Sequence, residues 1–243
     1  MREPVDRMLV VIPTYNESEN LPRIVARVRA ATPLVDILIA DDNSPDGTGD
    51  IADALAAADA AVHVLHRPGK AGLGAAYLAG FEWALARGYD AVVEMDADGS
   101  HRPEDLPRLI AALPDADLVL GSRWVAGGQV VNWPLSRKLL SRGGNAYTRV
   151  MLRAPVRDAT GGYRIFRASA LRLLDLGAVE SQGYCFQVDL VWRAVQRGLV
   201  VREVPIMFVE RELGTSKMSR AIVLEALAKV TRWGIDDRLG RRR

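Results

Sequence analysis

The segment that most constrains this chain is residues 92–101, where an apolar, strand-like run ends in Asp96 and Asp98. Two carboxylates so close together are hard oxygen ligands of the kind that Mg²⁺ and Mn²⁺ prefer, and these cations commonly hold phosphate oxygens. Acidic pairs also cap helices and form turns. The pair alone therefore leaves a metal site and a simple turn both open.

The neighbouring sequence favours the metal site. Two other strand-like runs also end in polar clusters, VVIPTYNE at residues 10–17 and ILIADDNSPDG at residues 37–47. We expect strands at residues 8–13, 35–41, 61–66 and 90–96, each followed by a helix. The first helix ends at residue 31, the second ends at residue 58, the third spans residues 72–87 and the fourth begins at Pro103. This alternation predicts an α/β fold with a mostly parallel sheet and helices on both faces. Ligands of such sheets bind at the carboxyl ends of the strands, where all three clusters fall.

The clusters can divide the binding of a nucleotide among them. Tyr15 can stack on a base, Glu17 and Asp42 can accept hydrogen bonds from base or ribose, and the Asp96/Asp98 pair can hold the metal. A packed core ring is the alternative for Tyr15. The glycine-rich run at residues 69–76 (GKAGLGAA) fits a phosphate contact or a bare helix start equally well, since it has neither the P-loop nor the GxGxxG spacing.

Charge is unevenly distributed along the chain. Residues 36–59 contain seven aspartates and no lysine or arginine, whereas residues 123–172 contain ten basic residues and one acid, Asp158. The acidic stretch is typical of metal and nucleotide binding. The basic stretch indicates a phosphate-bearing partner or an anionic surface.

A predicted helix at residues 137–153 lies in the basic stretch. Four basic residues on it fall within about 60° of one another beside an apolar face. The basic residues are Lys138, Arg142, Arg149 and Arg153, and the apolar ones are Leu139, Leu140, Tyr147, Val150 and Met151. This pattern favours a helix at a membrane surface or one that receives a lipid phosphate, with an ordinary solvated helix as the alternative. The pair Gly143-Gly144 weakens the helix by roughly 1 kcal/mol per glycine.

The rest of the chain is consistent with one globular unit of 243 residues. It has no apolar run long enough to cross a membrane and no apolar segment near its start that resembles a secretory signal. The lone Cys185 excludes an intrachain disulfide and fits a reducing compartment. We expect helices at residues 187–197 and 220–233, a strand at 200–209, and a loop at 210–219 that closes over bound donor.

Seven motifs occur in order over about residues 8–218: PTYNE, DDNSPDGT, GKAGLG, MDADGSH, GSRWV, DATGGYRIFR and FVERELGTSK. With them the chain resembles the family 2 glycosyltransferases, and more closely their polyprenyl-phosphate (dolichyl-phosphate) mannose synthases. The resemblance implies a GT-A fold, a nucleotide-diphosphate sugar donor and a bound Mg²⁺ or Mn²⁺. We expect one GT-A domain, with a nucleotide-sugar half at residues 1–122 and an acceptor half at residues 123–243.

The resemblance also implies roles for individual residues. The guanosine part would contact Pro13, Tyr15, Glu17, Ala40 and Asp42. The metal and diphosphate would contact Asp96, Ala97 and Asp98, with Ser100 as a third metal contact, and the donor phosphates and sugar would contact Arg123, Arg211 and Lys217. The acceptor phosphate would contact Arg137, Ser141 and Arg142.

The expected reaction is inverting, metal-assisted transfer of mannose from GDP-mannose to a polyprenyl or dolichyl phosphate. A phosphate monoester has a second pKa of about 6, so it is already nucleophilic at neutral pH and needs no general base. This agrees with three histidines, His63, His66 and His101, that form no evident triad, although the carboxylates beside them leave an acid/base role open. We expect a cytoplasmic protein, peripheral on the cytoplasmic face of the membrane and with no nucleic-acid partner. Its lipid substrate, its basic surface or a separate membrane-anchoring subunit could hold it there.

Three alternatives remain open. A relative could transfer glucose from UDP-glucose to the same lipid phosphate. A processive polysaccharide synthase would carry a Gln-x-x-Arg-Trp motif, which this sequence lacks. A non-catalytic nucleotide-sugar sensor or a nucleic-acid binder fits less well, because the metal and phosphate residues are intact and the aromatic content is only 6%.

Overall fold

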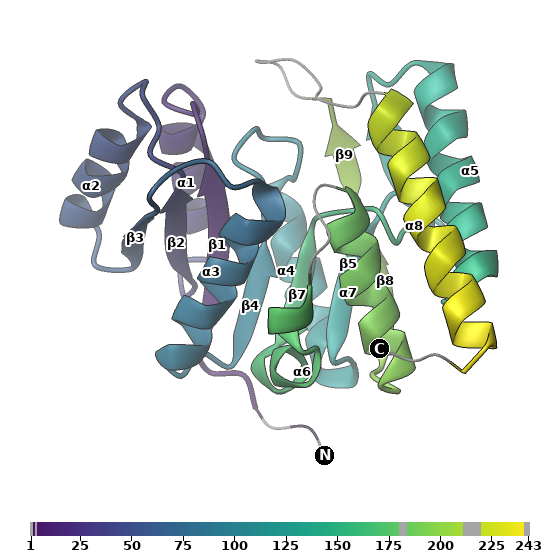
Figure 1. Cartoon of the computed structure of the whole chain (residues 1–243). Coiled ribbons are helices and arrows are strands. Elements are labelled where there is room, and N and C mark those ends of the chain that lie inside the picture. Colours follow the sequence, from purple (N-terminus) through teal and green to yellow (C-terminus); the bar gives the residue numbers. More distant parts are fainter. Residues whose placement is uncertain (1, 3, 180–183, 211–219, 241–243) are drawn as a thin grey trace.

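A mostly parallel sheet organises the chain (Figure 1), and the computed structural model describes residues 2, 4–179, 184–210 and 220–240. Within those residues the main sheet has seven strands in the order β3-β2-β1-β4-β7-β5-β8. They are β1 (Met8–Thr14), β2 (Asp36–Asp41), β3 (Val62–His66), β4 (Ala91–Glu94), β5 (Leu118–Ser122), β7 (Arg164–Arg167) and β8 (Val201–Pro205). Only β7 runs antiparallel to its neighbours, β4 and β5. The predicted α/β fold is confirmed.

Helices cover both faces of this sheet, and the alternation of side chains along β1 explains why. Leu9 and Val11 belong to one apolar cluster with α3 (Leu73–Ala86) and α7 (Tyr184–Gln196). Val10 and Ile12 belong to the other cluster, with α1 (Leu21–Ala31), α2 (Thr48–Ala58) and α4 (Leu106–Ala112). Successive strand residues point to opposite faces, so a continuous apolar strand needs two helical layers. Figure 1 shows α3 and α7 in front of the sheet and α1 and α4 behind it.

Helix α3 lies very close to the sheet at one glycine. A Cβ atom added at Gly80 would lie 2.5 Å from Cγ1 of Val11, too near for any side chain. Tyr77 and Phe81, which flank this contact on the same helix, are fully buried. The glycine therefore sets the distance between α3 and β1.

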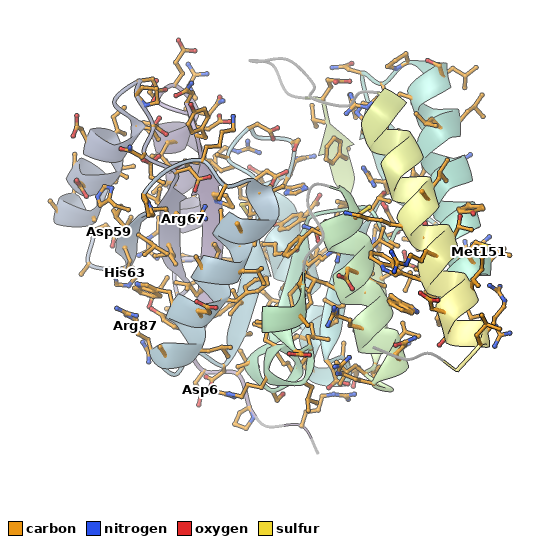
Figure 2. The ribbon with its side chains drawn as sticks, viewed as in Figure 1. Asp6, Asp59, His63, Arg67, Arg87 and Met151 are labelled. Atoms are coloured by element: carbon orange, nitrogen blue, oxygen red, sulfur yellow. The ribbon has the colours of Figure 1, made fainter. Side chains whose placement is uncertain are left out.

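Helices α5 (Leu135–Leu152) and α8 (Arg220–Arg238) form a pair at one end of the sheet (Figure 1). The hydroxyl of Tyr147 lies 2.5 Å from Oγ1 of Thr231. A Cβ at Gly234 would lie 2.6 Å from the carbonyl oxygen of Met151, which Figure 2 labels on α5. The expected helix at 137–153 is thus confirmed, and Gly143-Gly144 lies inside it without a break.

The predicted strand at residues 200–209 is wrong, because the chain changes sheets at Ile206. β8 belongs to the main sheet, whereas β9 (Met207–Val209) pairs with β6 (Gln129–Val131) in a small second sheet. The Ile206 N–H donates to the Ser122 carbonyl at 3.1 Å, and its own carbonyl accepts from Gln129 N at 2.9 Å. The N–H of Ile206 therefore bonds to the main sheet and its carbonyl bonds to the small second sheet.

The strand predicted at residues 90–96 is also too long, since β4 ends at Glu94. The backbone N–H of Asp96 donates instead to Nδ1 of His101 at 3.0 Å. In the described part of the chain, no helix is both long enough and apolar enough to cross a membrane.

Candidate active site

The predicted polar clusters meet at one edge of the main sheet. β1, β2, β4 and β5 run parallel, so the residues that follow Thr14, Asp41, Glu94 and Ser122 all emerge there. β7 runs the other way, so the segment before its first residue lies at the same edge. The site is therefore built from four strand ends and one strand start.

The loops after β1 and β2 are tied together by side-chain hydrogen bonds. Thr14 Oγ1 donates to Asp41 Oδ1 at 2.8 Å, and the N–H of Asn16 donates to Ser44 Oγ at 3.1 Å. Asn16 adopts a left-handed backbone with φ 60°, a conformation that asparagine tolerates well. The N–H of Glu17 donates to Oγ1 of Thr48 at 3.0 Å. The two motifs PTYNE and DDNSPDGT thus form one wall.

Tyr15 lies in this wall and is half-buried, with Nζ of Lys70 3.9 Å from its ring centroid. The ring is therefore at the site edge and not in the core. The same contact brings the glycine-rich run to the site, where Gly72 (φ 94°) begins α3. Lys70 is thus placed beside the residue expected to stack on a base.

The other residues expected to contact the nucleotide are less exposed. Asp42 is 5% exposed and forms an ion pair with Arg67, which follows β3 and is labelled in Figure 2. Ala40 is fully buried in β2, and Pro13 is half-buried in β1. Any ligand of the Asp42 carboxylate would therefore share it with Arg67.

Asp96 and Asp98 follow β4 on a tight turn. Tyr77 donates its hydroxyl to Oδ1 of Asp96 at 2.9 Å, and the Asp96 side chain is 31% exposed. The N–H of Ser100 donates to Oδ1 of Asp98 at 3.0 Å across Gly99, whose φ is 76°. Burial, and then the charge of Asp96, raises the pKa of Tyr77 well above its ordinary value, so it remains a donor.

This turn fits a divalent cation that shares its ligands with a phosphate. Among the described residues, no three or more His, Cys, Asp or Glu side chains gather as a closed metal cluster. Mg²⁺ usually takes one or two carboxylates and completes its shell with waters and substrate phosphates. Two adjacent aspartates at the sheet edge suit that arrangement. Ser100, the expected third contact, is 3% exposed.

His101 supports the turn from behind. Its ring stacks on Tyr163 with centroids 5.1 Å apart and contacts the edge of Phe208 at 5.8 Å. Burial lowers its pKa below the ordinary value, against the charges of Asp96 and Asp98. Nδ1 accepts the Asp96 N–H, so the neutral ring carries its proton on Nε2. The sequence places His101 next to the acidic motif, the only signal that could have identified this role.

Arg123 follows β5 and is held by Asp158, the single acid of the basic stretch. The Asp158 carboxylate accepts three hydrogen bonds from Arg123: from Nε at 2.8 Å, from Nη2 at 2.7 Å and from the backbone N–H at 2.9 Å. Burial alone would raise the pKa of Asp158, but the charge and hydrogen bonds of Arg123 outweigh it and lower that pKa. The Arg123 guanidinium also lies 5.4 Å from the ring centroids of Trp133 and Phe208.

The segment around Asp158 is fastened to α5 and β8. Asn145 of α5 accepts the Ala159 N–H at 2.8 Å and donates to Oγ1 of Thr160 at 3.1 Å. Glu203 of β8 accepts the N–H groups of Arg157 and Asp158 at 2.8 and 2.9 Å. These contacts connect the expected acceptor helix to the arginine of the expected donor site.

The residues expected to bind the acceptor phosphate separate into two groups. Arg137 is half-buried, forms an ion pair with Glu210, and lies 4.0 Å from the Trp133 ring that Arg123 also approaches. Ser141 is half-buried, and its carbonyl accepts from Asn145 at 3.0 Å. Arg142 is exposed and faces Trp124 instead. Arg211, Lys217 and the loop expected to close over the donor lie outside the described residues.

The prediction that the basic stretch as a whole faces an anionic partner is wrong for two of its arginines. Arg164 is fully buried and donates to the carbonyls of Gly161, Ala159 and Gln187, each at 2.7 Å. Arg167, 6% exposed, donates to two other carbonyls. Arg164 thus holds the segment before β7 and the start of α7, and Arg167 holds the segment before β5, so both side chains are directed into the protein and not toward a partner.

The family profile named Glycosyl transferase family 2 matches residues 9–174. The chain belongs to this family. As a family 2 glycosyltransferase it is 59% identical over 242 residues to the polyprenol monophosphomannose synthase of Mycolicibacterium smegmatis, covering 99% of this chain and 91% of that protein. It is 60% identical over 229 residues to the undecaprenyl-phosphate mannosyltransferase of Micrococcus luteus, covering 94% of both.

Solved structures support the fold of this glycosyltransferase. Glucosyl-3-phosphoglycerate synthase from Mycobacterium tuberculosis, in complex with Mn²⁺, UDP and glucosyl-3-phosphoglycerate, matches with a TM-score of 0.65 at 21% identity, over 97% of this chain and 80% of that one. Its complex with Mn²⁺, UDP-glucose and phosphoglyceric acid matches with a TM-score of 0.67 at 20% identity, with the same coverage. The expected GT-A fold is confirmed.

Proposed function

We propose that this glycosyltransferase moves mannose from GDP-mannose to a polyprenyl phosphate, with inversion at the anomeric carbon and with a divalent cation. The observation that carries the proposal is the Asp96/Asp98 turn at the same sheet edge as Arg123. The names of two relatives that are about 60% identical over almost the whole chain support the sugar and the acceptor class.

The donor side requires relief of charge on the departing diphosphate. Asp96 and Asp98 would hold Mg²⁺ or Mn²⁺, which when bound neutralises the diphosphate oxygens as the sugar bond breaks. Ala97 lies between them and is 4% exposed, and we assign it a diphosphate contact from the family resemblance. We extend the same role to Arg123, Arg211 and Lys217 from the family resemblance.

The nucleoside side uses the wall formed by the first two loops. Tyr15 would stack on the guanine, with Pro13 and Ala40 at the strand ends below it. Glu17, two residues after Tyr15, is half-buried and accepts from Asn20 Nδ2 at 2.7 Å. With Asp42 it supplies the carboxylate acceptors that a guanine edge or a ribose hydroxyl can use.

The acceptor side needs a cationic pocket but no general base. Arg137 and Ser141 lie on the face of α5 that also carries Asn145, and Asn145 reaches the Arg123–Asp158 pair. An acceptor phosphate bound there is a dianion at neutral pH and attacks directly. His101 is buried and its acceptor nitrogen, Nδ1, already accepts the Asp96 N–H, so it does not act as a base in this scheme.

A lipid acceptor brings the enzyme to a membrane surface. Leu135 and Leu139 of α5 are 70% and 61% exposed and lie one helical turn apart, so they form a small apolar patch on the surface. We propose a peripheral position on the cytoplasmic face, with a separate anchoring subunit as a further partner. The nucleotide and metal residues then belong to residues 1–122 of one domain, and the acceptor residues, together with the donor-phosphate residues Arg123, Arg211 and Lys217, belong to residues 123–243.

The test is transfer of label from GDP-[¹⁴C]mannose to a detergent-dispersed polyprenyl phosphate with Mg²⁺ or Mn²⁺. Label should enter the organic phase only with metal. Asp98→Asn should lower the rate at least 100-fold, because a bound cation supplies several kcal/mol of charge stabilisation. The matched control is Asp53→Asn, an aspartate on α2 whose side chain is 58% exposed. Transfer from UDP-glucose but not GDP-mannose would instead identify a glucosyltransferase.

A further inference from the structure

A second basic pocket lies on the outer side of α5; it includes Arg142 but neither Arg137 nor Ser141, the other two expected acceptor residues. It has a volume of about 390 Å³ and is lined by Trp124, Arg142, Ala146, Arg149 and Arg157. Arg137 and Arg142 are five residues apart, which places them about 140° apart around the helix. The pocket is therefore separate from the face of α5 that approaches Arg123.

The pocket is built for an anion. Its lining contains three arginines and no carboxylate. All three side chains are exposed, and none forms an ion pair with an acid among the residues that the structure describes. Three guanidinium groups around one cavity repel one another, and a phosphate would relieve that repulsion while accepting paired N–H groups.

Several contacts hold these groups in place. Arg142, Ala146 and Arg149 recur at the i, i+4, i+7 spacing of one helix face, and the small alanine leaves the space between the two arginines. The Arg142 guanidinium lies 4.9 Å from the Trp124 ring centroid. The Arg157 N–H donates to Glu203 at 2.8 Å, which fixes the segment that carries the third arginine.

The surface beside the pocket is apolar. Leu135, Leu139 and Val150 are 70%, 61% and 66% exposed. On an α-helix these positions fall within about 80° of Arg142, on the side away from the buried Asn145. An anion bound in the pocket thus lies next to leucine and valine side chains that water covers poorly. This combination fits an amphiphile and not a free inorganic ion.

We propose that this pocket binds the phosphate headgroup of an anionic phospholipid and holds the outer face of α5 against the bilayer. The proposal extends the proposed function, since a lipid-linked acceptor has to be reached at a membrane. The headgroup phosphate is a non-reacting ligand. The reacting phosphate binds on the Arg137 side of the helix, so the two phosphates occupy different faces of α5.

The test is co-sedimentation of the whole protein with vesicles, without donor or polyprenyl phosphate. Vesicles of phosphatidylcholine alone are compared with vesicles that contain phosphatidylglycerol. The pocket variant is Arg149→Gln/Arg157→Gln. The matched control is Arg172→Gln/Arg197→Gln, which removes the same charge at exposed positions in α6 (Ala168–Leu173) and after α7. Figure 1 shows α6 well apart from α5.

The wild type and the control should bind the anionic vesicles and not the neutral ones. The pocket variant should bind roughly 25-fold more weakly, since each arginine near an anionic surface strengthens binding about fivefold. Equal weakening in both variants, or wild-type binding that ignores phosphatidylglycerol, would overturn the proposal. Circular dichroism and melting temperature show whether each variant is folded, and Arg149→Glu provides a second pocket variant.

Soluble ligands distinguish a lipid headgroup from free phosphate. Dihexanoyl phosphatidylglycerol, below its micelle concentration, should raise the melting temperature of the wild type and the control but not of the pocket variant. An equal rise with inorganic phosphate would overturn the lipid assignment. Failure of mannose transfer in detergent with vesicle binding intact would contradict the proposed function alone, whereas transfer without pocket-dependent binding would contradict this proposal alone.

Discussion

Arg123 and Asp158 form a doubly hydrogen-bonded ion pair inside the site, with Nε and Nη2 at 2.8 and 2.7 Å from the two carboxylate oxygens. The two side chains are only 6% and 0% exposed. Burying two charges is unfavourable unless their geometry is good, and removing one partner leaves the other stranded. The pair therefore fixes the direction of the Arg123 guanidinium. A variant that removes one partner should lose much of its folding stability.

Asp158→Asn should lower the free energy of unfolding by about 3–5 kcal/mol, since it leaves the Arg123 charge buried without its partner. Urea denaturation at pH 7 measures this loss. Asp53→Asn, at an exposed aspartate, should change stability by less than about 0.5 kcal/mol. A similar loss in both variants would mean that the pair contributes nothing specific.

The same variant predicts a pH dependence. The folded pKa of Asp158 is below its ordinary 3.8, so the stability from its ionisation is fully present above that value. It is lost as the pH falls through the folded pKa. The difference between wild type and Asp158→Asn should therefore be constant from pH 7 to pH 5 and shrink below about pH 4. A difference that shrinks already between pH 7 and 6 would contradict this assignment.

Tyr77→Phe should lower the affinity of the enzyme for its metal and leave the reaction itself intact. The hydroxyl that donates to Asp96 at 2.9 Å is lost, whereas the ring keeps its stacking on Phe186 at 6.3 Å. Loss of a partner that orients a metal ligand typically lowers metal affinity 10–100-fold. Titration of activity with Mn²⁺ should show a half-saturating concentration about tenfold higher. A fall in kcat at saturating metal with unchanged half-saturation would contradict the role.

Tyr15→Leu should raise the KM for the donor roughly tenfold, because an aromatic ring under a base contributes about 1–3 kcal/mol. The ring also lies against Lys70, with Nζ 3.9 Å from its centroid. Tyr15→Phe keeps the ring and serves as the matched control, with KM near that of the wild type. Initial rates over a range of donor concentrations measure both. An equal KM for the leucine and phenylalanine variants would exclude stacking.

Two glycine substitutions should have opposite effects on stability. Gly80→Ala forces a methyl group to within 2.5 Å of Val11, which should cost about 1–3 kcal/mol. Gly143→Ala has nothing within 4 Å of the new methyl group and should gain about 0.5–1 kcal/mol from lower backbone entropy in the unfolded chain. Thermal and urea unfolding compare them. Stabilisation by both would mean that α3 can move away from β1.

The first half of the fold was predictable because its signals are local. Each strand before Pro103 is a short apolar run followed by a turn and a helical pattern, so type and order follow from neighbouring residues. The break at Ile206 was not predictable, since it depends on Ser122 and Gln129, which lie far away in the sequence. A continuous apolar run contains no sign that its two parts join different sheets.

The site shows the same division. Asp96 and Asp98 can be recognised from the sequence, because they directly follow an apolar strand. Asp158 gains its role only because β7 runs antiparallel, which brings the segment before β7 beside Arg123. The two sides of α5 were separable in principle, as Arg137 and Arg142 differ by about 140° in helix angle. Which side is buried, however, is shown only by the structure, in which Asn145 and Thr148 are buried and Asn145 bonds to Ala159, outside the helix.

The position of β7 also determines how the chain can be divided. β4 is bonded to β1 and β7, and β5 to β7 and β8, so β4 and β5 share no hydrogen bonds. A fragment that stops at Ser122 would carry the metal turn and the nucleotide wall, yet β5 would have no partner and β4 an open edge. Exposed edges of this kind promote aggregation. The residues expected to bind the nucleotide all precede residue 100, but the gap between β4 and β5 in the sheet beneath them is filled only after the ribosome has passed Arg167.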